Sequence, residues 1–107
     1  MKCKNKDKCK TNIATMEIIG SKWNLIIIWS LKNKTLRFTE LQKTIGNINS
    51  KTITKHLRDL ERNNIIKRIV YPEVPPRVEY SLTEQGKAFI PILESIIEWG
   101  STLHKNK

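Results

Sequence analysis

The chain has 107 residues, 38% of them hydrophobic and 28% charged, which is long enough for one small globular domain and too apolar for a disordered chain. Its 20 lysines and arginines outnumber 10 acidic residues, and the net charge of +10 predicts a polyanionic partner, nucleic acid before an acidic membrane. The basic N-terminus is not followed by the apolar core of a secretory signal, and no apolar run is long enough to span a bilayer, so we expect a cytoplasmic protein without a membrane partner.

Polar and basic residues fill positions 1–10, where we expect a flexible tail, and the folded domain is expected over residues 11–107. Thr11 or Asn12 can cap a first helix, which Gly20 ends. A generally basic proteome is the alternative explanation for the charge of the tail and of the whole chain.

Ser21 can cap a second helix over residues 22–31, whose sequence KWNLIIIWSL is apolar on nearly every side. A helix without a polar face is buried all round, so this segment is the expected central helix of the core. After a polar turn, Thr39 can cap a short helix that ends near Ile45. The next residue, Gly46, suits the position that follows the end of a helix.

The following helix is expected to begin at Ser50 as its N-cap and to end near Asn63. Its apolar positions, spaced four and three residues apart, are Ile53, Leu57 and Leu60. The opposite face carries hydroxyl and basic side chains, which suit the base edges and phosphates of a DNA major groove. The candidate DNA-binding residues on this helix are Ser50, Lys51, Thr52, Thr54, Lys55 and Arg58. An ordinary solvated helix face is the alternative, and the basic hairpin that follows favours DNA.

Two strands are expected over residues 65–70 and 77–82, on either side of a segment that contains three prolines. This order predicts a hairpin that serves as a wing beside the preceding helix. Arg77 follows two prolines that stiffen its approach, so it is a candidate for contact with a minor groove or a phosphate. A surface ion pair with Glu73 or Glu79 is the alternative role for this arginine.

Thr83 can cap a last helix that runs to about His104. This helix carries two neighbouring apolar stripes, Phe89, Ile92, Ile96, Trp99 and Leu103 in one and Ile90, Leu93 and Ile97 in the other. Together they form a wider apolar face than one small core needs, which predicts packing on a second subunit. The dimerisation candidates are Ile13, Met16, Phe89, Ile92, Leu93, Ile96, Trp99 and Leu103. Burial of both stripes within one chain is the alternative.

The expected fold is α+β and mainly α, a winged helix-turn-helix with a two-stranded wing and N- and C-terminal dimerisation helices. Five segments in this order resemble HxlR-type transcriptional regulators, a branch of the MarR-like winged-helix proteins: IIGSKWNLIII, LRFTELQKTI, INSKTITKHLRDLERNNIIKR, YPEVPPRVEYSLTEQG and PILESIIEWG. The resemblance extends from Cys9 to Gly100. It implies a homodimer that binds a roughly palindromic operator in double-stranded DNA and usually represses a nearby gene, with residues 50–63 as the recognition helix and Arg77 on the wing.

Two cysteines, Cys3 and Cys9, are each flanked by lysines, and nearby positive charge favours the reactive thiolate. In a reducing cytosol we expect free thiols rather than a disulfide. Several members of the resembled family sense oxidants or electrophiles through a cysteine at the position of Cys9, which implies a redox role here, with Cys3 as a second candidate. The family usually has proline after that cysteine, where this chain has Lys10. Inert thiols in the tail are the alternative.

Catalysis has little support in the sequence. The only histidines are His56 and His104, and neither they nor the cysteines form a ligand set or a nucleophile–base pair, so we expect no enzyme, no metal and no cofactor. A winged-helix module that binds protein or RNA without sequence-specific DNA readout stays open as the rival function. The interleaved surface aromatics of common single-strand RNA binders are missing. No residue identifies a small-molecule effector.

Overall fold

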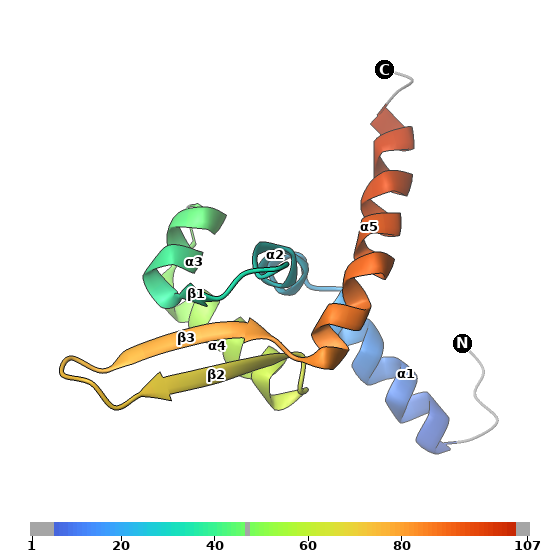
Figure 1. Cartoon of the computed structure of the whole chain (residues 1–107). Coiled ribbons are helices and arrows are strands. Elements are labelled where there is room, and N and C mark those ends of the chain that lie inside the picture. The colour runs from blue at the N-terminus through green and yellow to red at the C-terminus, as the bar shows by residue number, and fades with distance from the viewer. Residues whose placement is uncertain (1–5, 47, 105–107) are drawn as a thin grey trace.

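The structure is a computed structural model that describes residues 6–46 and 48–104, with the backbone alone over residues 6–12. Its elements, in chain order, are α1 (Lys6–Ile19), α2 (Lys22–Ser30), β1 (Leu36–Arg37), α3 (Phe38–Ile45), α4 (Ser50–Arg62), β2 (Ile66–Tyr71), β3 (Arg77–Leu82) and α5 (Glu84–His104). Figure 1 shows the helices grouped around α2 and a hairpin that extends away from them. This mainly helical arrangement with a small antiparallel sheet is the expected one.

The central helix of the core is α2, as predicted, and it packs against α1, α3, α4 and α5. Its residues Ile27 and Ile28 are fully buried. The expectation that α2 is buried on every side is wrong for one face, because Ile26 and Trp29 are 37% and 39% exposed. On that face the ammonium of Lys32 lies 4.7 Å from the centre of the Trp29 ring.

The two helices of the helix-turn-helix, α3 and α4, each begin at a different cap from the expected one. The N-cap of α3 is Arg37, not Thr39, because β1 ends there and the backbone N–H of Arg37 donates to Oε1 of Glu40 at 2.9 Å. The N-cap of α4 is Asn49, whose Oδ1 accepts from the backbone N–H of Lys51 at 2.7 Å. Ser50, the expected cap, is the first residue of α4.

The sheet has three antiparallel strands in the order β1-β3-β2. The predicted hairpin is present, with Ile66 paired to Leu82 at its base and Tyr71 to Arg77 near its tip. Ile66 and Leu82 are both buried against the helices. The third strand, β1, was not expected, because a two-residue strand is too short to leave a periodic pattern in the sequence.

The first helix begins earlier than predicted. The structure starts α1 at Lys6, so the expected flexible tail over residues 1–10 is wrong for residues 6–10. Nothing in the sequence from Lys6 to Ile19 opposes the longer helix, since that segment has no glycine or proline. Cys9 therefore lies inside α1 rather than before it, whereas Cys3 falls outside the described residues. None of the described helices is both long enough and apolar enough to cross a membrane.

Candidate nucleic-acid interface

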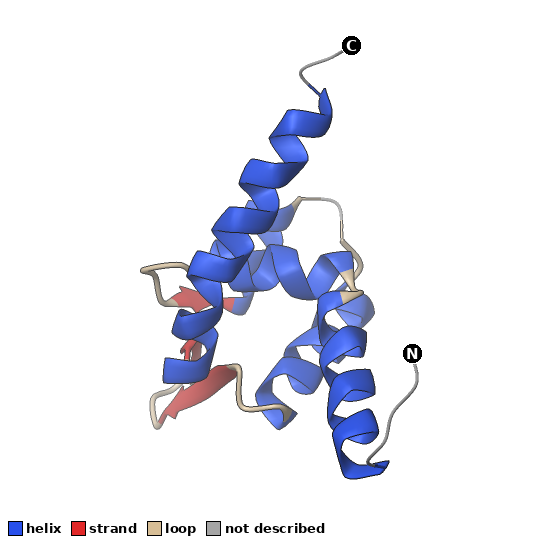
Figure 2. Ribbon diagram, turned by 90° about the vertical axis from the view of Figure 1, so that its right-hand side faces the viewer, coloured by secondary structure: helices blue, strands red, loops and turns tan. Residues whose placement is uncertain are grey.

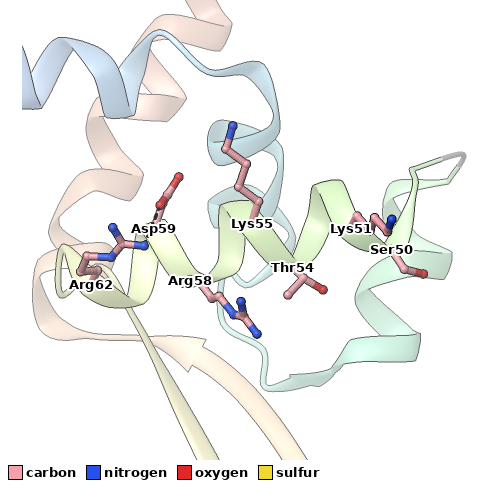
Figure 3. Close-up of a pocket in the computed structure, with 7 residues that line it drawn as sticks. All are labelled: Ser50, Lys51, Thr54, Lys55, Arg58, Asp59 and Arg62. Carbon is pink, nitrogen blue, oxygen red and sulfur yellow. Dashed lines mark ion pairs between the residues drawn. The ribbon is translucent and has the colours of Figure 1, made fainter.

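The outward face of α4 forms one continuous polar surface. Its orientation is fixed by Ile53, Leu57 and Leu60, which are buried on the other side of the helix. Seven residues line an open hollow along the outward face, and Figure 3 draws them: Ser50, Lys51, Thr54, Lys55, Arg58, Asp59 and Arg62. These residues recur every three to four positions, so one side of a DNA groove can contact all of them.

Five of the six residues predicted on this helix lie together in that hollow, and the sixth does not. Thr52 is half-buried on the flank of α4 and does not line the hollow. Two residues that the sequence analysis missed, Asp59 and Arg62, extend the surface toward the end of the helix. Arg62 stands four residues after Arg58, so continuing the helical spacing by one turn would have found it.

The positive charges on this face differ in how far they are neutralised. Arg62 pairs with Asp59, the closest oxygen lying 3.3 Å from its Nη2. Within the described ranges, the recorded ion pairs do not include Lys51, Lys55 or Arg58, and all three side chains are exposed. The N-terminal two-thirds of α4 thus presents unpaired cations, which is the pattern that phosphate binding requires.

The start of α4 is held in place by α3. Nε2 of Gln42 donates to Oγ of Ser50 at 3.0 Å and, less closely, to the backbone carbonyl of Ile48 at 3.5 Å. These contacts use the oxygen of Ser50 as an acceptor and leave its proton available to an external acceptor such as a base edge. The predicted role of Ser50 at the interface is therefore compatible with its place in the fold.

The middle of α4 is tied to α2 through a buried polar contact. Nδ1 of His56 lies 2.9 Å from Oδ1 of Asn24 and 3.4 Å from Oγ of Ser21. Asn24 is 5% exposed, and its Nδ2 donates to the carbonyl of Ile18 at 3.2 Å. His56 therefore links α4 to the corner between α1 and α2. Sequence patterns hold no signal for this contact, because the partner lies 32 residues away.

Arg77 forms the surface ion pairs with Glu73 and Glu79 that were the alternative to a DNA contact. Its guanidinium stacks over the ring of Tyr71, with the central carbon 4.1 Å from the ring centre. Its Nη2 lies 3.4 Å from Oε1 of Glu73, and its Nε lies 3.9 Å from Oε2 of Glu79. The wing arginine is thus held by an aromatic ring and two carboxylates, and its charge is largely offset within the wing.

The second surface of interest lies on α1 and α5. Six of the eight dimerisation candidates are exposed apolar residues in the single chain: Ile13, Met16, Ile92, Ile96, Trp99 and Leu103. The assignment of Leu93 is wrong, because it is 3% exposed and belongs to the core of one chain. Phe89 also packs partly against that core. Both residues lie in the first half of α5, which packs on the body of the molecule, whereas the second half projects beyond it (Figure 1).

A helix-turn-helix with an unpaired basic face on its second helix, followed by an antiparallel wing, defines the winged-helix class of transcriptional regulators. Within this class the chain belongs to the HxlR-like helix-turn-helix family, whose pattern its residues 18–107 match. The fold prediction and the family resemblance are therefore both confirmed, and the protein is a helix-turn-helix transcriptional regulator.

Related proteins carry the same description. The chain is 49% identical over 92 residues to an HTH-type transcriptional regulator of Methanothermobacter thermautotrophicus, covering 86% of this chain and 70% of the relative. A solved MarR-family regulator from Porphyromonas gingivalis W83 is 37% identical, with a TM-score of 0.80 and coverage of 94% and 97% of the two chains. The redox regulator HypR in its oxidised form is 40% identical, with a TM-score of 0.76 and coverage of 82% and 91%.

Proposed function

We propose that the protein binds a pseudo-palindromic operator in double-stranded DNA as a homodimer and represses the adjacent gene, without catalytic activity, metal or cofactor. The observation that carries this proposal is the row of unpaired cations Lys51, Lys55 and Arg58 on the solvent face of α4. Ser50 and Thr54 stand beside them and add hydroxyl groups that can read base edges.

The homodimer is supported by the exposed apolar residues of α1 and α5. A soluble chain rarely leaves so many large apolar side chains in one region without a partner. A second copy of this chain brings an identical apolar face, and two-fold pairing is the commonest way in which such faces meet. Such a pair presents two α4 helices to DNA, about 34–36 Å apart, which is one helical turn of the duplex.

Specific binding is tested with the reduced protein and duplex DNA from upstream of its own gene and the neighbouring genes. A random duplex of equal length at the same near-physiological salt is the comparison. We expect a preference of roughly a thousandfold or more for one of the upstream duplexes. The Lys55→Ala variant should lose most of this affinity, whereas Lys87→Ala, a charge loss at the exposed start of α5, should lose little. Equal and salt-sensitive binding of all duplexes points instead to a winged-helix module for protein or RNA.

We also propose that Cys9 makes this regulator responsive to oxidants or electrophiles. HypR, one of the similar solved structures, is described as a redox regulator. In this chain Cys9 is the fourth residue of α1, within the first turn, where free backbone N–H groups favour a thiolate. The lysines on either side of Cys9 act in the same direction.

The redox proposal predicts that diamide or a quinone releases the wild-type protein from its operator. Under reducing conditions the Cys9→Ser variant should bind the operator as the wild type does. It should resist release by diamide or a quinone, because the sulfur that reacts is gone. Cys3→Ser is the matched control, because Cys3 is the other thiol of the chain and is also flanked by lysines. Release of Cys9→Ser at the wild-type dose of diamide excludes Cys9 as the sensor, and loss of release in Cys3→Ser alone transfers the role to Cys3.

A further inference from the structure

A second hollow lies beside the recognition helix, between α4 and the wing, and encloses about 340 Å³. Six residues line it: Thr54, Leu57, Arg58 and Glu61 from α4, Arg68 from β2 and Tyr80 from β3. Two arginines from different elements, Arg58 and Arg68, therefore line one hollow. Of the six, only Thr54 and Arg58 are also part of the outward face of α4.

The sheet register explains why Arg68 reaches this hollow. Arg68 is paired with Tyr80 across the hairpin, two residues beyond the buried pair of Ile66 and Leu82. Residues two apart on a strand share a face, so Arg68 and Tyr80 continue the face that packs against the helices. Lys67, the residue before Arg68, lies on the opposite face of the same strand, and both side chains are exposed.

Figure 3 shows how the α4 side chains are directed relative to the hairpin. The side chains of Arg58 and Thr54 are directed to the side of α4 on which the hairpin lies, whereas Lys55 is directed to the other side. Among the recorded ion pairs of the described segments, none involves Arg58, Arg68 or the carboxylate of Glu61. Arg58 and Arg68 are both exposed and have no acidic partner among these pairs, so an anion in the hollow can pair with both. Glu61 contributes a carboxylate to the same lining and opposes a second anion there.

We propose that this hollow is a clamp for one phosphate of the DNA backbone, held by Arg58 and Arg68 with the hydroxyl of Tyr80. The inference rests on the proposed function, operator binding through α4, and takes α4 in a major groove with the wing over the adjacent minor groove. Neighbouring grooves are separated by a single sugar–phosphate strand, which must therefore cross the space between α4 and the wing. The planar guanidinium of Arg68 can donate two parallel hydrogen bonds to a phosphate, and the Tyr80 hydroxyl can donate one more.

The test compares Arg68→Gln with Lys67→Gln, two neighbours that lose the same charge on opposite faces of β2. Affinity is measured for the operator and for a random duplex across a series of salt concentrations. A lost phosphate contact lowers the slope of log K against log salt by about 0.9. Arg68→Gln should show this change and weaken both duplexes roughly tenfold, because phosphates carry no sequence information. Lys67→Gln should stay close to wild type.

Two further variants change the hollow without removing an arginine. Tyr80→Phe removes the hydroxyl alone and should weaken both duplexes by a few fold. Glu61→Gln removes the carboxylate that borders the phosphate and should bind both duplexes more tightly than Glu84→Gln, a matched change at the start of α5. Arg68→Lys keeps the charge, so it should restore the salt slope and only part of the affinity, which separates a phosphate contact from a folding defect.

The clamp is overturned if Arg68→Gln and Lys67→Gln have the same salt slope, or if Glu61→Gln binds no more tightly than Glu84→Gln. The proposed function fails by a different result, the absence of any preference of the wild-type protein for upstream DNA. Because the random duplex also carries phosphates, the Arg68 comparison remains decisive in that case.

Discussion

Asn49 and Ser50 stand side by side at the start of α4, and both are residue types that cap helices well. The structure selects Asn49, whose backbone is extended with φ −65° and ψ 139° and whose side chain bonds the N–H of Lys51. Ser50 instead accepts from Gln42 and lines the hollow on the outward face of α4. A shift of one residue in the cap therefore leaves the Ser50 proton without a role in capping the helix.

This assignment of the cap can be tested through stability. Asn49→Ala should lower the free energy of unfolding by about 1 kcal/mol, because a free N–H at the start of α4 loses its acceptor. Ser50→Ala removes only an exposed side-chain contact and should cost no more than about 0.5 kcal/mol. Urea unfolding of the two variants gives the comparison. A larger cost for Ser50→Ala than for Asn49→Ala contradicts the assignment.

At the scale of elements, the junction between α4, β2 and α5 depends on a close backbone approach. Oγ1 of Thr83 donates to the carbonyl of Asn64 at 2.7 Å and accepts from the N–H of Gly86 at 3.1 Å, so one side chain joins two elements. A Cβ on Gly86 would collide with the backbone carbonyl of Ile65. Glycine is thus required where the first turn of α5 passes over the turn between α4 and β2.

Gly86→Ala should therefore destabilise the protein by about 2 kcal/mol or more, since the collision is with backbone and no side chain can move aside. The cost exceeds the gain of about 1 kcal/mol that alanine usually brings to a helix interior. Lys87→Ala, at the exposed next residue, should change stability by less than about 0.5 kcal/mol. Thermal unfolding of both variants checks this. A stabilised Gly86→Ala protein would show that the backbone at Gly86 lies far enough from the Ile65 carbonyl to admit a methyl group.

The elements that sequence reasoning predicted well are those with a strong local pattern. Apolar spacing in α4 and alternation around a proline-rich turn in β2 and β3 survive in the structure almost unchanged. The errors lie where tertiary contacts decide. The pairing of β1 with β3 ends at Arg37, which becomes the N-cap of α3, and Leu93 belongs to the buried core of the chain. The sequence did not predict Arg68 as a site residue, because its position beside α4 depends on which face of the hairpin packs toward that helix.

At the scale of the whole molecule, the wing and the proposed dimer surface lie at opposite ends. Figure 1 shows the tip of the hairpin on one side and α1 and α5 on the other, and the turned view in Figure 2 shows α5 extending beyond the body. The contact of His56 with Asn24 joins the recognition helix to α2, which also packs against α1 and α5. α4 is therefore connected to α1 and α5 through the packed helix α2.

The dimer surface gives the last prediction, because it is apolar, exposed and distant from the hairpin. Trp99 is 64% exposed on α5, so Trp99→Asp should leave the fold of one chain intact while placing a charge in the proposed contact between subunits. Val74, at the fully exposed tip of the wing, provides the matched control Val74→Asp.

Sedimentation velocity should find a dimer for the wild type and Val74→Asp and a monomer for Trp99→Asp. Operator affinity should fall with the dimer, because one subunit no longer holds the other near its half-site. A Trp99→Asp protein that sediments as a dimer would place the subunit contact elsewhere.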